Sequence, residues 1–250
     1  MKRFYALLIV ALFATAPALM AQSASFYNAT RDAEKMIKKM PTENYRRVYV
    51  GFNDAHINWK DYDHECEMWY PVKSGFTLGY LQSYHILKGL PVFVEYGANI
   101  QYLFGKEELS EAFAGWLGAD CYKANTFALN IPVNVSMRLS FENNTIAVTP
   151  YAGLNFRINL AGKQITEGEV LDKPYTAEVR LFDSSDKEGA AGKNAFKRFQ
   201  MGLNYGVSFS YDVYTLSVGR VSDFTRIANF NDHTYKGRMG VTTISVGYSF

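Results

Sequence analysis

The chain has 250 residues, of which 48% are hydrophobic and 16% aromatic, and a formal net charge of +2 at pH 7. This length suits one large all-β domain or two ordinary domains. Lys2 and Arg3 lie in a segment that we expect to be removed, which leaves 24 basic against 24 acidic residues. A neutral chain without a basic run gives no indication of nucleic-acid binding.

The first 21 residues have the layout of a secretory signal peptide. A basic start is followed by an apolar stretch from about Tyr5 to Phe13, then by small residues and Pro17. This stretch is too short to span a bilayer as a helix, so we expect cleavage before Gln22. No later run reaches the ~18 apolar residues that a spanning helix needs. The mature protein is therefore predicted to be exported, and any insertion into a membrane must use strands.

Residues 22–44 form a lead-in with a different composition. The stretch FYNATRDAEKMIKKMPTEN, residues 26–44, is polar and charged and indicates a short amphipathic helix or a solvated arm. We expect this lead-in to lie in the periplasm, ahead of a single β domain that occupies residues 45–250.

From residue 45 onward, apolar and polar residues alternate along the chain. A period of two residues predicts β-strands with unlike faces. In chain order we expect strands at about 47–53, 74–87, 91–104, 126–141, 145–160, 199–211, 214–219 and 242–250. Eight consecutive strands favour an up-and-down antiparallel barrel.

The connections between the strands alternate in length. Three are short, at 88–90, 142–144 and 212–213, and four are long, at about 60–71, 105–121, 163–197 and 227–237. The longest is polar, charged and rich in turn residues, which predicts a mobile surface loop.

The polar faces of the strands decide which side meets water. They carry Gly, Ser, Thr, Asn and Gln with a few arginines and one acid, and no lysine lies in the middle of a strand. The exposed face of a soluble barrel would carry lysine and glutamate. Lysine at mid-membrane on a lipid face would cost ~2–4 kcal/mol, which accounts for its exclusion. The sequence therefore predicts an all-β transmembrane barrel of eight strands, apolar towards lipid and polar within.

Aromatic residues gather near both ends of the predicted strands, as in the two interfacial belts of membrane proteins. The belt near the short turns comprises Tyr84, Phe141, Tyr211, Tyr214, Tyr248 and Phe250. The belt near the long loops comprises Phe52, Phe76, Tyr102, Phe104, Phe127 and Phe199. Short turns are typical of the periplasmic end of such barrels and long loops of the extracellular end.

The last nine residues, TTISVGYSF, resemble the terminal signal of bacterial outer-membrane barrels. The resemblance implies that the barrel-assembly machinery reads Tyr248 and Phe250, and that the last strand pairs with the first. Three further stretches, LPVFVEYGANIQYLFG, ALNIPVNVSMRL with VTPYAGLNFRI, and FQMGLNYGVSFSYDVYTLSVGRVSDF, resemble the small porin-like outer-membrane barrels common in Bacteroidetes. This resemblance covers residues 45–250 and implies a fold and an outer-membrane location, without a catalytic motif.

Four charged residues, Arg47, Glu95, Arg138 and Arg157, fall on the inward side of the predicted strands. An eight-stranded barrel has an interior only wide enough for side chains to fill, and charges buried there must be paired or hydrated. We expect an Arg–Glu lattice that plugs the lumen, and the alternative is a water-filled ion path. Three arginines against one glutamate are not neutral, so either the assignment of inward positions is wrong at some point, or water and an unassigned acid complete the lattice.

The only cysteines, Cys66 and Cys121, lie in the first two long loops, which are neighbours around one rim. An exported protein meets an oxidising compartment, so a disulfide is predicted, with two free thiols as the alternative. Cys66 belongs to the stretch DYDHECEMWY, where His64 and several acids offer either a divalent-cation site or a solvated acidic tip. We favour the tip and predict neither a metal nor a cofactor.

The sequence indicates a structural or binding role, in which the barrel displays surface loops for adhesion or assembly. One alternative is a narrow porin for small solutes or ions, and a third is a lipid-modifying enzyme, which would need a Ser–His–acid group near a membrane surface. We predict that the protein is not an enzyme. The expected partners are outer-membrane lipid and the barrel-assembly machinery, and the sequence does not name a surface ligand.

Overall fold

A computed structural model describes residues 42–60, 71–87, 89–108, 121–141, 145–170, 173–183, 196–230 and 235–250. The predicted signal peptide, 1–21, and most of the lead-in, 22–44, lie outside these residues. Within the described ranges, no helix is long and apolar enough to cross a bilayer.

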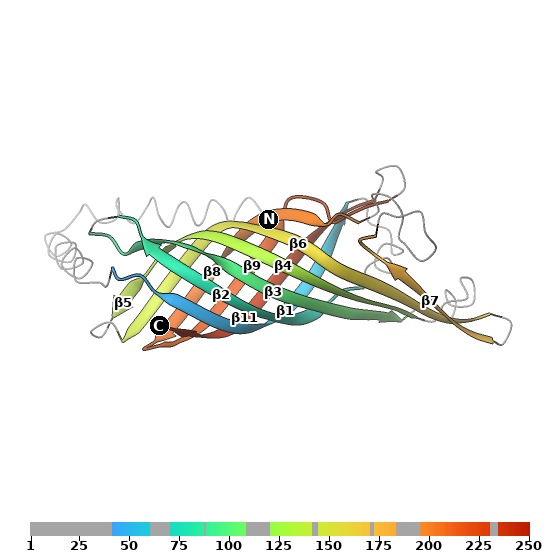
Figure 1. Cartoon of the computed structure of the whole chain (residues 1–250), viewed down its shortest axis with the longest axis horizontal. Coiled ribbons are helices and arrows are strands. Elements are labelled where there is room, and N and C mark those ends of the chain that lie inside the picture. Colours follow the sequence, from blue (N-terminus) through green and yellow to red (C-terminus); the bar gives the residue numbers. More distant parts are fainter. Residues whose placement is uncertain are drawn as a thin grey trace, which may run out of the picture.

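The described residues form one antiparallel sheet of 11 strands that wraps around an elongated barrel (Figure 1). The strands are β1 (Arg46–Lys60), β2 (Ser74–His85), β3 (Val92–Glu108), β4 (Cys121–Met137), β5 (Leu139–Phe141), β6 (Ile146–Val170), β7 (Lys173–Arg180), β8 (Phe199–Tyr211), β9 (Tyr214–Asp223), β10 (Ala228–Phe230) and β11 (Tyr235–Ser249).

In the described part of the chain, eight of these strands close a ring in the order β1, β2, β3, β4, β6, β8, β9, β11 and back to β1. The closing pair runs from Arg47↔Ser249 to Lys60↔Lys236. Beyond it, Arg46 and Phe250 each donate a backbone hydrogen bond to the other, with N–O distances of 2.9 Å. The predicted up-and-down antiparallel barrel is thus confirmed, and its closure leaves no unpaired sheet edge in the part that faces lipid.

The other three strands extend the barrel at its ends. β5 continues the course of β4 after Arg138, whose backbone N–H donates to the carbonyl of Pro91 at 2.9 Å. β10 pairs with the start of β11. β7 pairs with the outer part of β6, from Lys163↔Arg180 to Val170↔Lys173.

The prediction of a loop at 163–197 is wrong for its first half. β6 runs for 25 residues and forms a hairpin with β7 that projects from one end of the barrel (Figure 1). The pairing of β3 with β4 also continues outward, to Glu108↔Cys121. Both faces of these extensions meet water, so both carry polar residues and the alternation that marks a membrane strand fades from the sequence.

The side chains of the ring are sorted by polarity in the sense predicted. Large apolar side chains point outward and are exposed, among them Val50, Leu78, Val135, Leu203 and Ile244. Small polar side chains point inward and are buried, among them Asn53, Thr77, Asn130, Thr149 and Ser208. This is the reverse of a soluble barrel and the arrangement of a transmembrane one.

Rings of the two predicted aromatic belts are in contact across strands. At the loop side, meaning the end with the extended strands, Phe52, Phe76, Tyr102 and Phe127 occupy one continuous register across β1 to β4. Phe52 and Phe76 have ring centroids 5.7 Å apart in an edge-on contact. At the turn side, the opposite end, the Tyr214 and Tyr248 centroids are 6.1 Å apart.

Candidate functional site

The interior of the barrel is the best-defined polar site of the described chain, and its turn-side end is organised by Tyr45. The Tyr45 hydroxyl donates to Oε1 of Glu95, which is itself buried. The guanidinium carbons of Arg47 and Arg138 lie 5.6 Å and 5.0 Å from the centre of the Tyr45 ring. The Tyr45 backbone is fixed by Ser83, whose hydroxyl both donates to its carbonyl and accepts from its N–H at 2.9 Å.

Arg47 reaches across the interior from β1. Its Nη1 donates to Oγ of Ser208 on β8 at 3.2 Å, and its Nε donates to Oγ of Ser249 on β11 at 3.5 Å. Arg47 is only 5% exposed, so these hydroxyls take the place of water around the guanidinium.

Two tyrosine rings fill the middle of the lumen by lying against glycines. A Cβ added at Gly79 would fall 2.3 Å from Cζ of Tyr49, and one added at Gly219 would fall 2.1 Å from Oη of Tyr151. Glycine at these strand positions therefore permits the close approach of each ring to the wall. Tyr49 and Tyr151 both border the same internal cavity.

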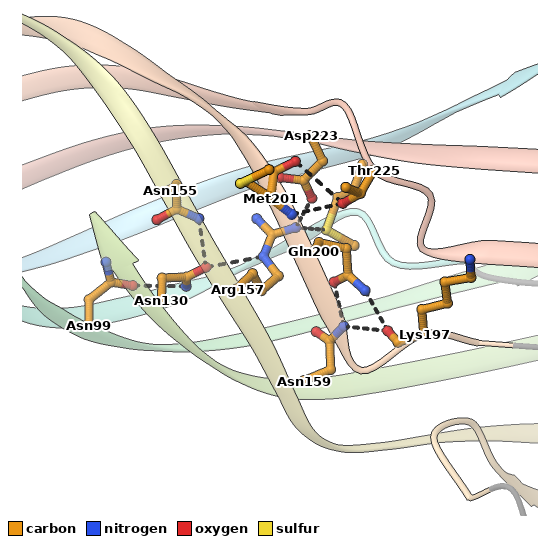
Figure 2. A network of polar contacts seen from close by, with 11 residues as sticks. Asn99, Asn130, Asn155, Arg157, Asn159, Lys197, Gln200, Met201, Asp223 and Thr225 are labelled. Carbon is orange, nitrogen blue, oxygen red and sulfur yellow. Dashed lines mark hydrogen bonds and ion pairs between the residues drawn. The ribbon is translucent and has the colours of Figure 1, made fainter. Parts of the chain in front are cut away.

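Towards the loop side, Arg157 joins four strands in one network (Figure 2). Its Nη1 forms an ion pair with Oδ2 of Asp223 at 2.6 Å, with side-chain exposures of 1% and 0%. Its Nε donates to Oδ1 of Asn130 at 3.1 Å. Asn130 also accepts from Asn155 at 3.2 Å and donates to Asn99 at 3.0 Å. The guanidinium thus ties β6 to β3, β4 and β9.

A second group of contacts fastens the chain that enters β8 (Figure 2). Nδ2 of Asn159 donates to Oε1 of Gln200 at 2.5 Å and to the carbonyl of Lys197 at 3.2 Å. Gln200 donates to the same carbonyl. Met201 N–H donates to Oγ1 of Thr225 at 2.7 Å, which holds the segment after β9 beside β8.

The four charged residues expected inside the barrel divide into two groups. Arg47 and Glu95 lie near Tyr45 at the turn-side end, with half-buried Arg138 beside them. Arg157 belongs instead to the network with Asp223 and Asn130 towards the loop side. The partner of Arg157 is Asp223 and not Glu95.

Asp223 is the acid that the sequence analysis left unassigned. It was missed because the strand at 214–219 was ended too early, whereas β9 continues to Asp223. If the series of inward positions, every second residue, is continued from Gly219 through Val221, it reaches Asp223. Gly202 lies opposite Asp223 in β8 and leaves room for it, because a Cβ there would fall 2.6 Å from the carboxylate Oδ1.

An apolar cluster closes the mouth of the barrel at the loop side. Its buried members are Ala55, Val72, Leu103, Ala124, Leu181, Phe182, Phe196, Ile227, Met239 and Val241. Those beyond the ring strands come from the residues before β2, after β7, before β8 and after β9. The rings of Phe182 and Phe196 meet edge-on with centroids 6.1 Å apart. The pair Leu181-Phe182 within a charged stretch was the available sequence signal for this cluster.

The space left in the interior is small. A cavity of about 80 Å³ is lined by Arg47, Glu95 and Arg157 together with amides, hydroxyls and the two tyrosines. Such a volume holds a few water molecules. The mouth cluster lies at the loop-side end of this cavity, and the contacts around Tyr45 lie at its turn-side end.

The structure describes only one of the two cysteines of the predicted disulfide. Cys121, at the start of β4, is a buried free thiol whose Sγ donates to Oε2 of Glu167 at 3.4 Å. Burial, and then the bond to Glu167, raise the pKa of the Cys121 thiol above its ordinary value. Cys66 lies outside the described residues, so the bridge stays a prediction.

The acidic stretch 61–70, with His64, also lies outside the described residues. Within the described ranges, no group of three or more His, Cys, Asp or Glu side chains is placed to hold a metal ion. Tyr248 and Phe250 are exposed on the outward face at the turn side, with ring centroids 6.3 Å apart.

No protein-family model and no curated protein matches the chain. Among solved structures, it is similar to Ail, the attachment invasion locus protein of Yersinia pestis, with a TM-score of 0.38 and 11% identity over 83% of this chain and 99% of Ail. Neisserial surface protein A matches with a TM-score of 0.37 and 13% identity, over 83% of this chain and 97% of that protein. A major outer membrane protein from Thermus thermophilus matches with a TM-score of 0.42 and 12% identity, over 83% of this chain and 100% of that protein. Because these TM-scores are all below 0.5, the assignment of the barrel fold rests on the strand order and on the polarity of the side chains described above.

Breaking the buried ion pair should destabilise the barrel strongly. We expect Asp223→Ala to lower the free energy of unfolding by about 3–5 kcal/mol, because it leaves the Arg157 guanidinium buried without its partner. Replacing both residues, Arg157→Met with Asp223→Leu, should cost less than Asp223→Ala alone. Urea unfolding of the refolded protein, followed by the heat-modifiable gel shift, measures both effects.

The matched control is Glu178→Gln, which breaks the exposed pair with Lys163 at 3.2 Å. Exposed pairs are worth about 0–1 kcal/mol, so this variant should unfold close to the wild type. Equal losses for Asp223→Ala and Glu178→Gln would contradict the structural role given to the buried pair.

The thiol of Cys121 should react slowly at neutral pH. In a Cys66→Ser variant, we expect slow maleimide labelling that accelerates as the pH rises, because the thiolate forms only above the raised pKa. Glu167→Gln removes a charge that holds the pKa of Cys121 up, so it should speed the labelling. If Cys121 in the Cys66→Ser variant is labelled at the rate of an exposed thiol, the result contradicts the buried position of this thiol. Labelling of the wild type with and without reductant tests the bridge to Cys66.

Proposed function

We propose that this protein is a non-conducting outer-membrane barrel that serves as a rigid base for an extracellular binding surface. The observation that carries the proposal is the blocked interior. The Arg157–Asp223 pair is buried inside the barrel, Tyr49 and Tyr151 line the internal cavity, and an apolar cluster of buried side chains lies at the loop-side mouth.

Several features support the outer-membrane location. The outward side chains are apolar and exposed, and aromatic belts flank them at both ends. The predicted signal peptide at 1–21 supplies export, and the resemblance to porin-like barrels of Bacteroidetes implies the same membrane. In this orientation the N-terminus and the short turns are periplasmic, and the extended ends of β3, β4, β6 and β7 lie outside the cell.

The extended strands supply the surface that we propose to bind a partner. Their outward face carries the ion pairs Lys106–Glu108, Lys123–Glu167 and Lys163–Glu178. Of the described strands, only β6 pairs with β7, so no described strand occupies the other edge of β7. An open edge offers backbone N–H and C=O groups to an added strand, and charged side chains there restrict which partner is accepted. The role that follows is adhesion or assembly, and the proposal assigns no catalytic step to the chain.

One observation favours the alternative of a narrow porin. The internal cavity is polar, and its lining extends from Arg47 to Arg157. Water in this cavity would be the middle part of an ion path. An ion would still have to displace the Tyr45 group at one end and the mouth cluster at the other, so we rank this function second.

Conductance separates the two functions. We expect refolded residues 22–250 in planar bilayers to give no discrete openings, because both ends of the cavity are closed. A variant with Tyr49→Ala, Tyr151→Ala and Phe182→Ala removes rings from the lumen and the mouth and should give openings, which shows that the assay detects a pore. Reproducible steps from the unmodified protein would replace the proposed function with the porin.

We also infer that the last strand directs assembly. β11 closes the ring against β1, and Tyr248 and Phe250 place two aromatic rings at the turn-side rim of that seam. The resemblance to the terminal signal of outer-membrane barrels implies that the assembly machinery binds there.

Replacing the terminal aromatic residue tests this inference. Phe250→Asp should lower the amount of heat-modifiable barrel in the outer-membrane fraction, because it puts a charge in place of the aromatic ring. Phe250→Trp keeps an aromatic ring and should assemble normally. If the two variants assemble equally well, Phe250 is not part of the signal.

A further inference from the structure

Two open grooves lie side by side on the outward surface, at the loop-side aromatic belt. Their volumes are about 470 Å³ and 490 Å³, and they share Tyr102 of β3 and Asn125 of β4 in their walls. They cover the outer faces of β3, β4 and β6, where these strands leave the lipid-facing part of the barrel.

The side of the grooves nearest the lipid is apolar. Tyr102, Phe104, Phe127 and Leu160 form this floor, and all four are exposed large side chains. The floor is continuous with the outward face of β3 and β4, through Ile100 and Ile131. A hydrocarbon chain that leaves the bilayer along this face would therefore meet further apolar surface.

The opposite side of the grooves is cationic. Its basic side chains are Lys73, Lys106, Lys123, Lys163, Arg180 and Arg198. Five of these six are paired with acids: Lys73 with Glu107, Lys106 with Glu108, Lys123 with Glu167, Lys163 with Glu178 and Arg180 with Asp183. Nη1 of Arg198 donates to the carbonyls of Leu160 at 3.1 Å and Asn159 at 3.5 Å, which holds this guanidinium at the boundary between the apolar floor and the basic rim.

The existing ion pairs do not prevent a stronger anion from binding. All five pairs are partly exposed, with side-chain exposures between 26% and 73%. Exposed pairs contribute little to stability, and a phosphate offers more acceptor oxygens and more charge than one carboxylate.

The described side chains on the other side of the ring are arranged differently. On the outward face of β9, Arg220 is engaged by Thr242 at 3.2 Å and by Nε2 of His56 at 2.9 Å. Asp54, also on the outward side of β1, is an exposed acid beside this pair. Among the described side chains, the basic rim above an apolar floor therefore lies over β3, β4 and β6.

We propose that these grooves bind a membrane lipid with a phosphorylated headgroup, its phosphates on the basic rim and its acyl chains on the apolar floor. Charge complementarity and the order of the two surfaces along the membrane normal both fit an amphiphile. A small soluble phosphate would use the rim and leave the floor exposed. The inference rests on the membrane location proposed above but not on the closed lumen.

Binding is tested with purified lipid and refolded protein. Residues 22–250 in dodecyl maltoside micelles are mixed with bis-phosphorylated lipid A, and retained lipid is counted by native mass spectrometry. Phosphatidylcholine and inorganic pyrophosphate at the same concentration are the comparison probes. We expect lipid A to be retained, phosphatidylcholine to be lost, and pyrophosphate neither to bind nor to displace lipid A at equal concentration.

The matched variants remove charge from the groove or from elsewhere. Lys163→Gln, Arg180→Gln and Arg198→Gln together should weaken lipid A binding on the order of a hundredfold, at roughly fivefold for each cation lost near an anionic headgroup. Arg238→Gln removes an exposed cation on the outward side of β11 and should bind as the wild type does. The heat-modifiable gel shift confirms that each variant is folded.

Each outcome decides the proposal. Retention of lipid A by the triple variant at the wild-type level overturns it, as does an equal loss in Arg238→Gln. Displacement of lipid A by pyrophosphate at equal concentration would assign the rim to free phosphate and overturn the lipid. If the triple variant does not fold, the single substitution Lys163→Gln replaces it, and an unchanged affinity there overturns the proposal. Failure of this test would leave the conductance result untouched, because the grooves lie outside the lumen.

Discussion

The pairing of β1 with β11 is the constraint on which the rest of the structure depends. A backbone N–H or C=O without a partner is costly in hydrocarbon, so a sheet that crosses a membrane must close on itself. Here the two strands farthest apart in sequence supply that closure, over the register from Arg47↔Ser249 to Lys60↔Lys236. Once the ring is closed, each side chain of a membrane strand has only two choices, lipid or lumen, and the alternation along the sequence follows from that choice.

Closure also explains the chemistry of the interior. Polar and charged side chains forced into a narrow lumen need partners, and the Arg157–Asp223 pair with its asparagines supplies many of them across four strands, while Oδ1 of Asp223 has no hydrogen-bond partner among the described residues. The lumen is then filled and not open. The apolar cluster at the mouth has a different origin, because the chain segments that cross the loop-side end bring Leu181, Phe182 and Ile227 over a polar interior and seal it.

The alternation of residues predicted the features that a membrane imposes. It placed Leu78 and Ile244 outside, Thr77 and Arg157 inside, and the aromatic residues at both rims. It did not predict the β6–β7 hairpin, because both faces of Lys163–Arg180 meet water and the pattern carries no contrast there. Nor did it predict the mouth cluster or the role of Tyr45, since both depend on contacts between segments far apart in sequence. Asp223 was within reach of the pattern and was missed by ending one strand too early.

Nuclear magnetic resonance of the refolded, isotopically labelled barrel in lipid nanodiscs tests the central claim most directly. The account predicts nuclear Overhauser effects between lipid acyl chains and the methyl groups of Leu78, Leu203 and Ile244. It predicts none for the methyl groups of Thr77 and Thr149, together with backbone contacts between β1 and β11. Acyl-chain contacts to the threonine methyls, or the absence of β1–β11 contacts, would contradict a closed barrel that is apolar outside and polar within.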